Sequence, residues 1–115
     1  MKTYLHTGNK FLLILNHKTS KKVFVDTVVL LKGDINYTIF HLEDGKQKTV
    51  AHSIKFFEPF LETHGFLRIH RSYMINPTHV KNLIQEEYKV LMNNEQEALI
   101  SRRKKSVFKK ISEQF

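Results

Sequence analysis

The sequence predicts a mainly β fold with one or two short helices. Short runs rich in Val, Ile, Phe, Tyr and Thr recur along the chain, and turn-forming residues separate them every few positions. Two further stretches instead space their apolar residues at helical intervals. The length of 115 residues suits one domain with one modest hydrophobic core.

The predicted strands follow a polar N-terminal arm. Residues 1–10 are polar and are expected to form a loose arm, and residues 11–115 are expected to form the domain. The strands are expected, in order, at 11–15, 22–25, 28–31, 37–42, 47–51, 80–84, 88–92 and 97–100, with a broken strand between 66 and 76.

Two dipeptides predict tight turns between neighbouring strands. Asp44-Gly45 favours a two-residue hairpin turn, because both residues tolerate positive φ. Asn93-Asn94 predicts the turn between the last two strands, since Asn tolerates left-handed backbone.

Two short helices complete the predicted fold. Ser53 is expected to cap the first helix, in which Phe56, Phe57, Phe60 and Leu61 form one apolar face over the β core. Pro59 should keep this helix short or kinked. The second helix is expected near the C-terminus, where the apolar residues are Val107, Phe108, Ile111 and Phe115.

The charge balance points to a polyanionic partner. Nineteen Lys and Arg face eleven Asp and Glu, which gives a net charge of +8 and a pI near 9.8. Nucleic acid leads the candidates, an anionic membrane surface comes second, and a merely solubilising role for Lys is the alternative. The absence of Cys excludes disulfides and thiolate metal sites, and it favours a reducing, cytoplasmic location. The longest apolar run, 11–15, is too short to span a bilayer.

Arg71 interrupts an apolar alternation. In "FLRIHRSYMINP", residues 66–77, a continuous strand would place Arg71 on the same face as Ile69 and Tyr73. Burying an unpaired charge costs several kcal/mol or more. We therefore expect the strand to break at 70–72 and to present Arg71 outward from a loop. The alternative is that Arg71 pairs with a nearby Asp or Glu.

Two other polar breaks raise the same question. In "SRRKK", 101–105, basic residues open a predicted helix, where the helix dipole is already positive and where phosphate binds. The alternative is a helix that begins a few residues later with a solvated basic face. In "KGDIN", 32–36, Gly33 and Asp34 favour a tight turn, and Asn36 could read an adenine edge or be an ordinary turn residue.

No enzymatic or metal motif appears. The seven His residues form neither HExxH nor a zinc spacing. GxSxG, P-loop and GxGxxG motifs are absent, so we expect neither enzymatic activity nor a cofactor.

The chain resembles a known protein family. "FLRIHRSYMINPTHV", 66–80, resembles the central signature of LytTR DNA-binding domains, which runs F-x-R-x-H-R-S, three hydrophobic residues, Asn, three further residues and Val or Ile. "GDINYTIFHL" before it and "LISRRKKSVFKKI" after it extend the resemblance over residues 11–111.

The resemblance implies an elongated, antiparallel β fold that binds double-stranded DNA through loops inserted into successive major grooves. Carried over position by position, the base-contacting residues are Asn36, Arg71 and Arg103. These positions coincide with the three polar breaks. The residues expected to contact the DNA backbone or to support the loops are Tyr37, Ser72, Ser101, Arg102 and Lys104, and His70 and Asn76 are expected to brace a loop.

The same resemblance implies a bacterial transcription regulator of the response-regulator type, without a membrane partner. We expect a dimer on paired DNA sites and a receiver-domain or sensor partner. With about ten residues before the first predicted strand, the chain is either a stand-alone member or an excised domain. A small basic RNA-binding protein and a protein-interaction module that does not touch DNA are the alternatives.

Overall fold

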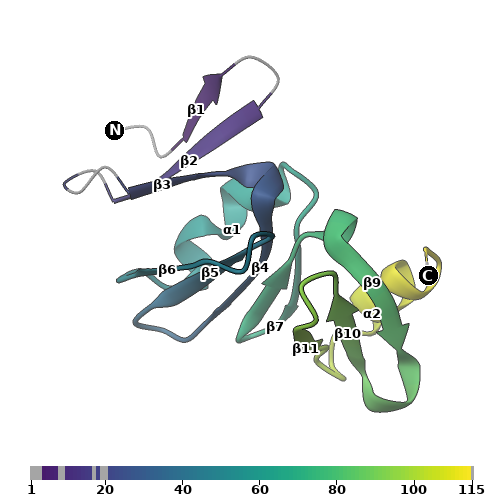
Figure 1. Cartoon of the computed structure of the whole chain (residues 1–115). Helices are drawn as coiled ribbons and strands as arrows, with labels where there is room; N and C mark the ends of the chain where they lie inside the picture. Colours follow the sequence, from purple (N-terminus) through teal and green to yellow (C-terminus); the bar gives the residue numbers. More distant parts are fainter. Residues whose placement is uncertain (1–3, 8–9, 17, 19–20, 115) are drawn as a thin grey trace.

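The computed structural model describes residues 4–7, 10–16, 18 and 21–114, and it is mainly β, as the sequence predicts. The molecule measures 43 × 30 × 24 Å along its principal axes and is therefore elongated. Figure 1 shows one small sheet at the N-terminal end, a central sheet, and a second small sheet beside the C-terminal helix.

The central sheet has five antiparallel strands and carries two of the three predicted site loops. Its spatial order is β6 (Gln47–Val50), β5 (Thr38–Leu42), β4 (Val28–Gly33), β8 (Tyr73–Ile75) and β7 (Leu67–His70). β4 is the middle strand, and it pairs with β5 on one side and with β8 on the other.

Each small sheet has three antiparallel strands. The first contains β1 (Tyr4–Thr7), β2 (Lys10–Asn16) and β3 (Lys21–Phe24), and the second has the order β11 (Glu97–Leu99), β10 (Lys89–Met92) and β9 (Val80–Ile84). The expectation of a loose arm is wrong for Tyr4–Thr7, which pairs with β2. A short 3-10 turn at Val25–Thr27 joins β3 to β4, and two more occur at Pro77–His79 and Gln85–Glu87.

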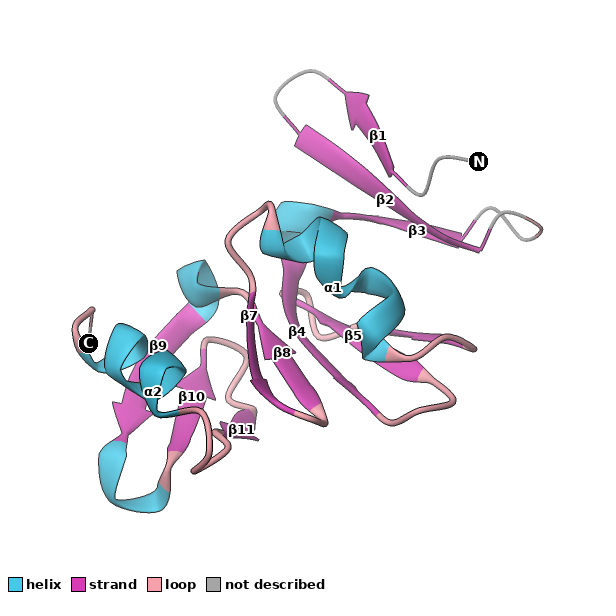
Figure 2. Cartoon of the chain, turned by 180° about the vertical axis from the view of Figure 1, so that it is seen from behind, coloured by secondary structure: helices cyan, strands magenta, loops and turns pink. Residues whose placement is uncertain are grey.

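Two α-helices flank the sheets (Figure 2). Helix α1 (Ile54–Glu62) covers one face of the central sheet, and α2 (Lys105–Ser112) lies beside the C-terminal sheet. Ser53 precedes α1 as predicted, but its hydroxyl makes no capping hydrogen bond. Phe57 and Leu61 are buried, whereas Phe56 is 50% exposed and stacks on His52, so the predicted apolar face is narrower than expected.

Strand β4 is buried on both faces, which explains its continuous apolar sequence. Val28 and Leu31 belong to a cluster that includes α1 and the N-terminal sheet, whereas Val29 and Leu30 belong to a second cluster with β9–β11 and α2. A strand whose side chains alternate strictly between its two faces would not divide these four residues between the clusters in this way. The β4–β5 register shifts between Val28 and Leu30, and this irregularity reverses the side-chain pattern. The core is therefore two clusters on either side of one strand, not the single core expected from chain length.

The predicted turns form, but with different backbone geometry. The β5–β6 turn uses Gly45 at φ 87°, while Asp44 keeps negative φ, and the Gly45 N–H donates to the Leu42 oxygen over 3.0 Å. The turn is therefore a three-residue type with one left-handed position, not a two-residue turn. In the β10–β11 turn the left-handed residue is Glu95, at φ 70°, and neither Asn93 nor Asn94.

Candidate nucleic-acid interface

The first loop, residues 34–37, joins β4 to β5 and is held by one carboxylate. Asp34 Oδ1 accepts hydrogen bonds from the backbone N–H of Asn36 over 2.7 Å and of Tyr37 over 3.0 Å. The Asp34 N–H donates to the Tyr37 oxygen over 3.1 Å. This side-chain turn fixes the loop backbone while the side chains of Asn36 and Tyr37 remain exposed.

Gly33 permits the close return of the first loop. A Cβ at this position would lie 2.4 Å from the backbone oxygen of Tyr37, a distance that real contacts do not reach. The Gly33 N–H also donates to the Ser72 oxygen over 3.0 Å, which ties the first loop to the second. Glycine is therefore required here by space, not by φ.

The second loop confirms the predicted strand break. β7 ends at His70 and β8 begins at Tyr73, and the turn between them consists of Arg71 and Ser72. Arg71 is exposed, as expected. His70 Nδ1 accepts the Ser72 N–H over 3.0 Å and braces the turn from inside.

Arg68 holds the second loop from below. Its Nε donates to the His70 oxygen over 2.9 Å, and its Nη2 donates to the Arg71 oxygen over 2.6 Å. Its Nη1 lies 2.6 Å from Oε1 of Glu58 on α1, and both side chains are mostly buried, at 18% and 25% exposure. The guanidinium thus donates hydrogen bonds to two backbone oxygens and to a carboxylate. It holds both carbonyl groups of the turn in place and anchors the turn to α1.

Asn76 fixes the far end of β8. Its side chain is buried, its Nδ2 donates to the Val28 oxygen over 3.1 Å, and its Oδ1 accepts from the N–H and hydroxyl of Thr78. This agrees with its expected role as a brace.

The third loop, residues 100–104, connects β11 to α2 and docks on the second. The Ser101 N–H donates to the Ile69 oxygen over 2.7 Å, and the Lys104 ammonium donates to the Arg68 oxygen over 3.1 Å. Ser101 Oγ accepts the Arg103 N–H over 3.2 Å, which shapes the loop around Arg103.

Arg102 is engaged within the fold. Its guanidinium carbon lies 4.3 Å from the centre of the Tyr88 ring, and Tyr88 stacks on Phe108 of α2 with ring centres 4.5 Å apart. This arrangement favours loop support over DNA contact for Arg102.

Helix α2 begins at Lys105, so the basic residues of "SRRKK" mostly precede it. The alternative of a later helix start is therefore the one observed. Lys104 is the N-cap residue and gives no side-chain cap. The positive charge thus lies on a loop.

Two hollows link the three loops into one edge. One, of about 660 Å³, is lined by Glu58, Arg68, His70, Arg71, Ser101, Arg103 and Lys104. The other, of about 450 Å³, is lined by Asp34, Ile35, Ser53, Ile54, Lys55, Arg68, Arg71 and Ser72. Arg71 lines both hollows, so it stands between the first loop and Arg103. Asn36 lines neither hollow, although its loop does.

Of the two acidic residues that line the hollows, Glu58 is in an ion pair and Asp34 accepts backbone N–H groups. Glu58 pairs with Arg68, and Lys89 bridges Glu87 and Glu97 over 3.1 Å and 2.8 Å. The hydrogen bonds that the Lys89 ammonium donates to Glu97 and Glu87 raise the pKa of Lys89. Within the described part of the chain, neither Arg71 nor Arg103 takes part in an ion pair, so the alternative of an Arg71–carboxylate pair is not observed.

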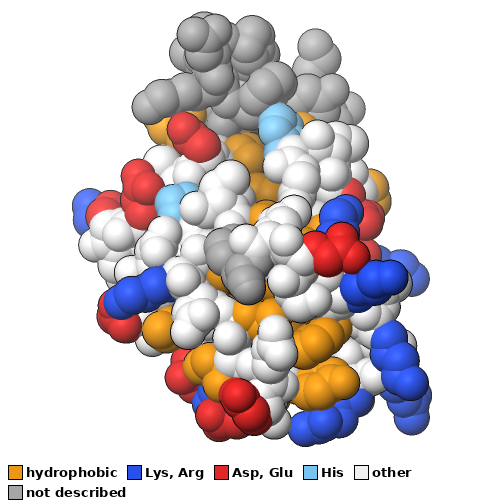
Figure 3. Space-filling model, turned by 90° about the vertical axis from the view of Figure 1, so that its right-hand side faces the viewer, with side chains coloured by type: hydrophobic (Ala, Val, Ile, Leu, Met, Phe, Trp, Pro, Cys, Tyr) orange, Lys and Arg blue, Asp and Glu red, His pale blue; other side chains and the backbone are white. Residues whose placement is uncertain are grey.

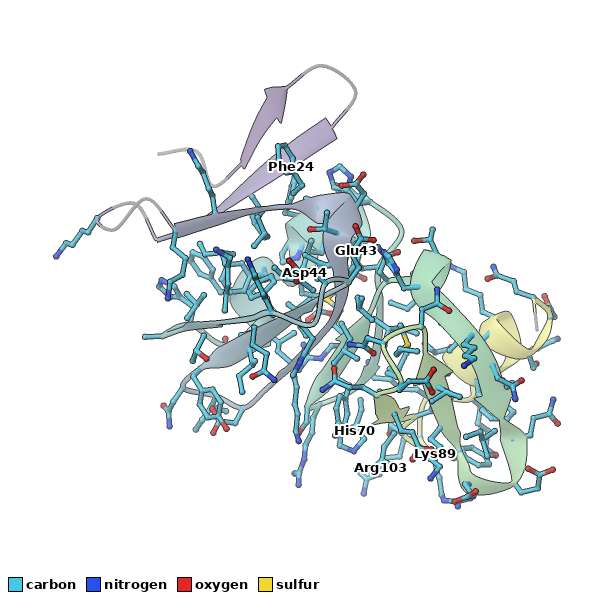
Figure 4. The ribbon with its side chains drawn as sticks, in the orientation of Figure 1. Phe24, Glu43, Asp44, His70, Lys89 and Arg103 are labelled. Atoms are coloured by element: carbon cyan, nitrogen blue, oxygen red, sulfur yellow. The ribbon has the colours of Figure 1, made fainter. Side chains whose placement is uncertain are left out.

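The charge distribution is uneven around the molecule. Figure 3 shows Lys and Arg side chains gathered mainly along the lower right of the face in view, whereas acidic side chains lie at its lower end and on both sides. Figure 4 shows His70 and Arg103 at the lower end of the sheets, away from Phe24, Glu43 and Asp44. Burial first, and then the charges of Arg71, Arg68 and Lys104, lower the pKa of His70. The loop edge is therefore a cationic surface around a neutral imidazole.

Searches for other kinds of site gave no candidate among the described residues. No grouping of His, Asp and Glu in the described ranges could hold a metal ion. No described helix has the length and apolar character needed to cross a membrane.

The sequence alone did not reveal Arg68, Glu58 and Ile35 as parts of this edge. Arg68 is next to Ile69 on β7 and looks like an ordinary strand cation, because its partner Glu58 is ten positions away on a helix. Ile35 could have been found as the single aliphatic residue inside "GDIN".

Comparison with known proteins identifies the family. The model of the LytTr DNA-binding domain matches residues 18–113. Among solved structures, the LytTr DNA-binding domain of a methyl-accepting/DNA response regulator from Bacillus cereus is similar in fold, with a TM-score of 0.70 and 22% identity over 96% of this chain and 97% of that chain. No match was found among curated proteins. Together with the signature at 66–80 and the matching architecture, the family match shows that the chain belongs to the LytTR DNA-binding domain family.

Proposed function

We propose that this domain binds specific double-stranded DNA through its three joined loops and acts as a bacterial transcription regulator in the cytoplasm. The observation that carries the proposal is the placement of Arg71 and Arg103 on one hollow, exposed and outside the ion pairs of the described residues. A guanidinium available for pairing can donate two hydrogen bonds to O6 and N7 of guanine.

We assign the individual residues the following roles. Arg71 and Arg103 read guanines in the major groove, and Asn36 reads an adenine edge from the first loop. Tyr37, Ser72, Ser101 and Lys104 contact phosphates or hold the loops, because phosphate contacts fix register without reading sequence.

Loops on a β scaffold can follow the DNA over more than one groove. The molecule is 43 Å long, which exceeds the ~34 Å of one helical turn. We propose that the loops enter successive major grooves and that two copies occupy paired sites. The relative from Bacillus cereus is described as part of a response regulator, and a receiver domain or sensor is accordingly the partner we propose.

Selection of the full chain on a randomised duplex library tests this function. The bound fraction, read by sequencing, should converge on a motif with guanines at fixed positions and with a constant half-site spacing. Titration of that motif at several salt concentrations should give a log–log slope of about −0.9 per phosphate contacted. Failure to enrich any motif, or affinity that does not change with salt, would refute the proposal. Single-stranded RNA that competes better than the duplex would favour the RNA-binding alternative.

A further inference from the structure

Ile35 lies at the tip of the first loop and is 86% exposed. It is the most exposed of the large hydrophobic side chains in the described part of the chain; the others, Phe24, Tyr37, Phe56 and Leu99, are between 38% and 50% exposed. The side chain therefore contributes little to the hydrophobic core. Its apolar surface is available to a partner.

The backbone around Ile35 is held firmly. Asp34 Oδ1 accepts two backbone N–H groups, one of them from Asn36, directly after Ile35. The Gly33–Ser72 hydrogen bond of 3.0 Å connects this loop to the turn that carries Arg71. Ile35 is thus presented at a fixed position relative to Arg71, which makes it suited to recognition that depends on spacing.

The surroundings of Ile35 are cationic. Ile35 lines the hollow of about 450 Å³ together with three cationic residues, Lys55, Arg68 and Arg71, and one acidic residue, Asp34, whose Oδ1 already accepts two backbone N–H groups. An apolar protein partner would have to cover these charged groups and remove them from water, which is unfavourable. A duplex supplies phosphates for the cations and also carries an apolar group in the major groove, the C5-methyl of thymine.

We propose that Ile35 contacts the C5-methyl group of a thymine and determines base preference at that position. This inference rests on the proposed DNA binding and deepens it. The thymine lies within a few base pairs of the guanine read by Arg71, because the two side chains line the same hollow. The contact selects thymine over cytosine by burying the methyl group against the isoleucine.

A deoxyuridine scan tests the contact, because uracil differs from thymine only by the methyl group. Each thymine of the selected site is replaced in turn by deoxyuridine, and affinity is measured for the unmodified protein and for Ile35→Ala. For the unmodified protein, one or two replacements near the Arg71 guanine should weaken binding by about fourfold, the value expected for one buried methyl group. Ile35→Ala should bind the thymine site more weakly and should not respond to deoxyuridine at that position.

Two further variants serve as controls. Ile35→Val keeps part of the branched surface, so its deoxyuridine response should be intermediate. Phe56→Ala removes a half-exposed apolar side chain from α1, outside both loop hollows, so its deoxyuridine response should equal that of the unmodified protein. Circular dichroism of all variants checks that the fold is kept.

The possible failures are distinguishable. Equal deoxyuridine responses in the unmodified protein and Ile35→Ala at every position, or a selected site without thymine near the Arg71 guanine, would overturn the role of Ile35 and leave DNA binding intact. If Ile35→Ala weakened binding to all duplexes by the same factor, this result would also overturn the role of Ile35 and leave DNA binding intact. Absence of any selected site would overturn both this inference and the proposed function.

Discussion

Arg68 donates a hydrogen bond of 2.6 Å from Nη2 to the backbone oxygen of Arg71, three residues further along the chain. One arginine thus positions another. The Arg68 guanidinium is also paired with Glu58 and bonded to the His70 oxygen, so its donors are engaged within the protein.

Arg68→Ala should therefore impair DNA binding without removing a DNA contact. The loss of these bonds leaves carbonyl groups unsatisfied and frees the turn, which should cost about 1–3 kcal/mol of stability. We expect affinity for the specific site to fall about tenfold, or ~1.4 kcal/mol. Arg68→Lys is the matched control, since it keeps the charge but not the fork of donors. Full rescue by Lys in duplex titrations would show that only charge matters.

Arg71→Ala and Arg103→Ala should each weaken the specific site by about 1–3 kcal/mol and relax preference at one guanine. Both side chains are exposed, so thermal stability should change little. Repeating the library selection with each variant measures the change in base preference. Lys81→Ala, which removes an exposed cation of β9 that is paired with Glu95 in the β10–β11 turn, is a control for charge alone. Equal weakening on random duplexes would reassign the arginines to the phosphate backbone.

His70 should make stability depend on pH. Its Nδ1 accepts the Ser72 N–H, so the folded state requires the neutral ring at that atom. Burial and then Arg71, Arg68 and Lys104 lower the folded-state pKa of His70, so the unfolded chain binds a proton more readily. The stabilisation is complete above the unfolded pKa of about 6.5, and it is lost as pH falls from there toward the folded pKa.

His70→Gln should thus reduce the loss of stability on acidification. Denaturant titrations at several pH values around and below about 6.5 measure this slope. The pKa values of His41 and His64 are also lowered by burial, so part of the slope should remain. An unchanged slope in His70→Gln would show that His70 does not contribute to it.

Gly33→Ala should disturb the first loop. The added Cβ would meet the Tyr37 oxygen at 2.4 Å, so the loop must shift, at a cost of about 1–3 kcal/mol. Affinity for the specific site should fall as well, because the shift moves Asn36. Gly65→Ala is the control, since Gly65 has φ 84° and an added Cβ would meet open space. That variant should lose stability through backbone strain but keep its DNA affinity; a similar loss of affinity in both would indicate a general effect of destabilisation.

The sequence predicts best the features that depend on local chemistry. The break at 70–72 follows from the cost of burying Arg71, and the strand at Val80–Ile84 follows from its own composition. Features that depend on distant partners were not predictable. β1 has a polar sequence and exists as a strand because β2 offers it a pairing edge. Phe56 has helical spacing but is half-exposed and stacks on His52.

The same contrast between local chemistry and distant partners applies to the candidate site. The three loops could be located because each interrupts an apolar pattern, whereas the ties between them could not. The Gly33–Ser72 bond and the Lys104–Arg68 bond join residues 39 and 36 positions apart, and no local pattern encodes such pairs. Whether Asn36, Arg71 and Arg103 contact bases stays a prediction for the experiments above.

The central position of β4 has a consequence for how the domain melts. Of its four consecutive apolar residues, the outer two belong to one cluster and the inner two to the other, so separating either cluster from the rest would expose part of the same strand to water. The two halves should therefore lose their structure together, in a single cooperative transition, although each has its own small sheet and helix. A domain built this way keeps its three loops at constant separation for as long as it is folded at all.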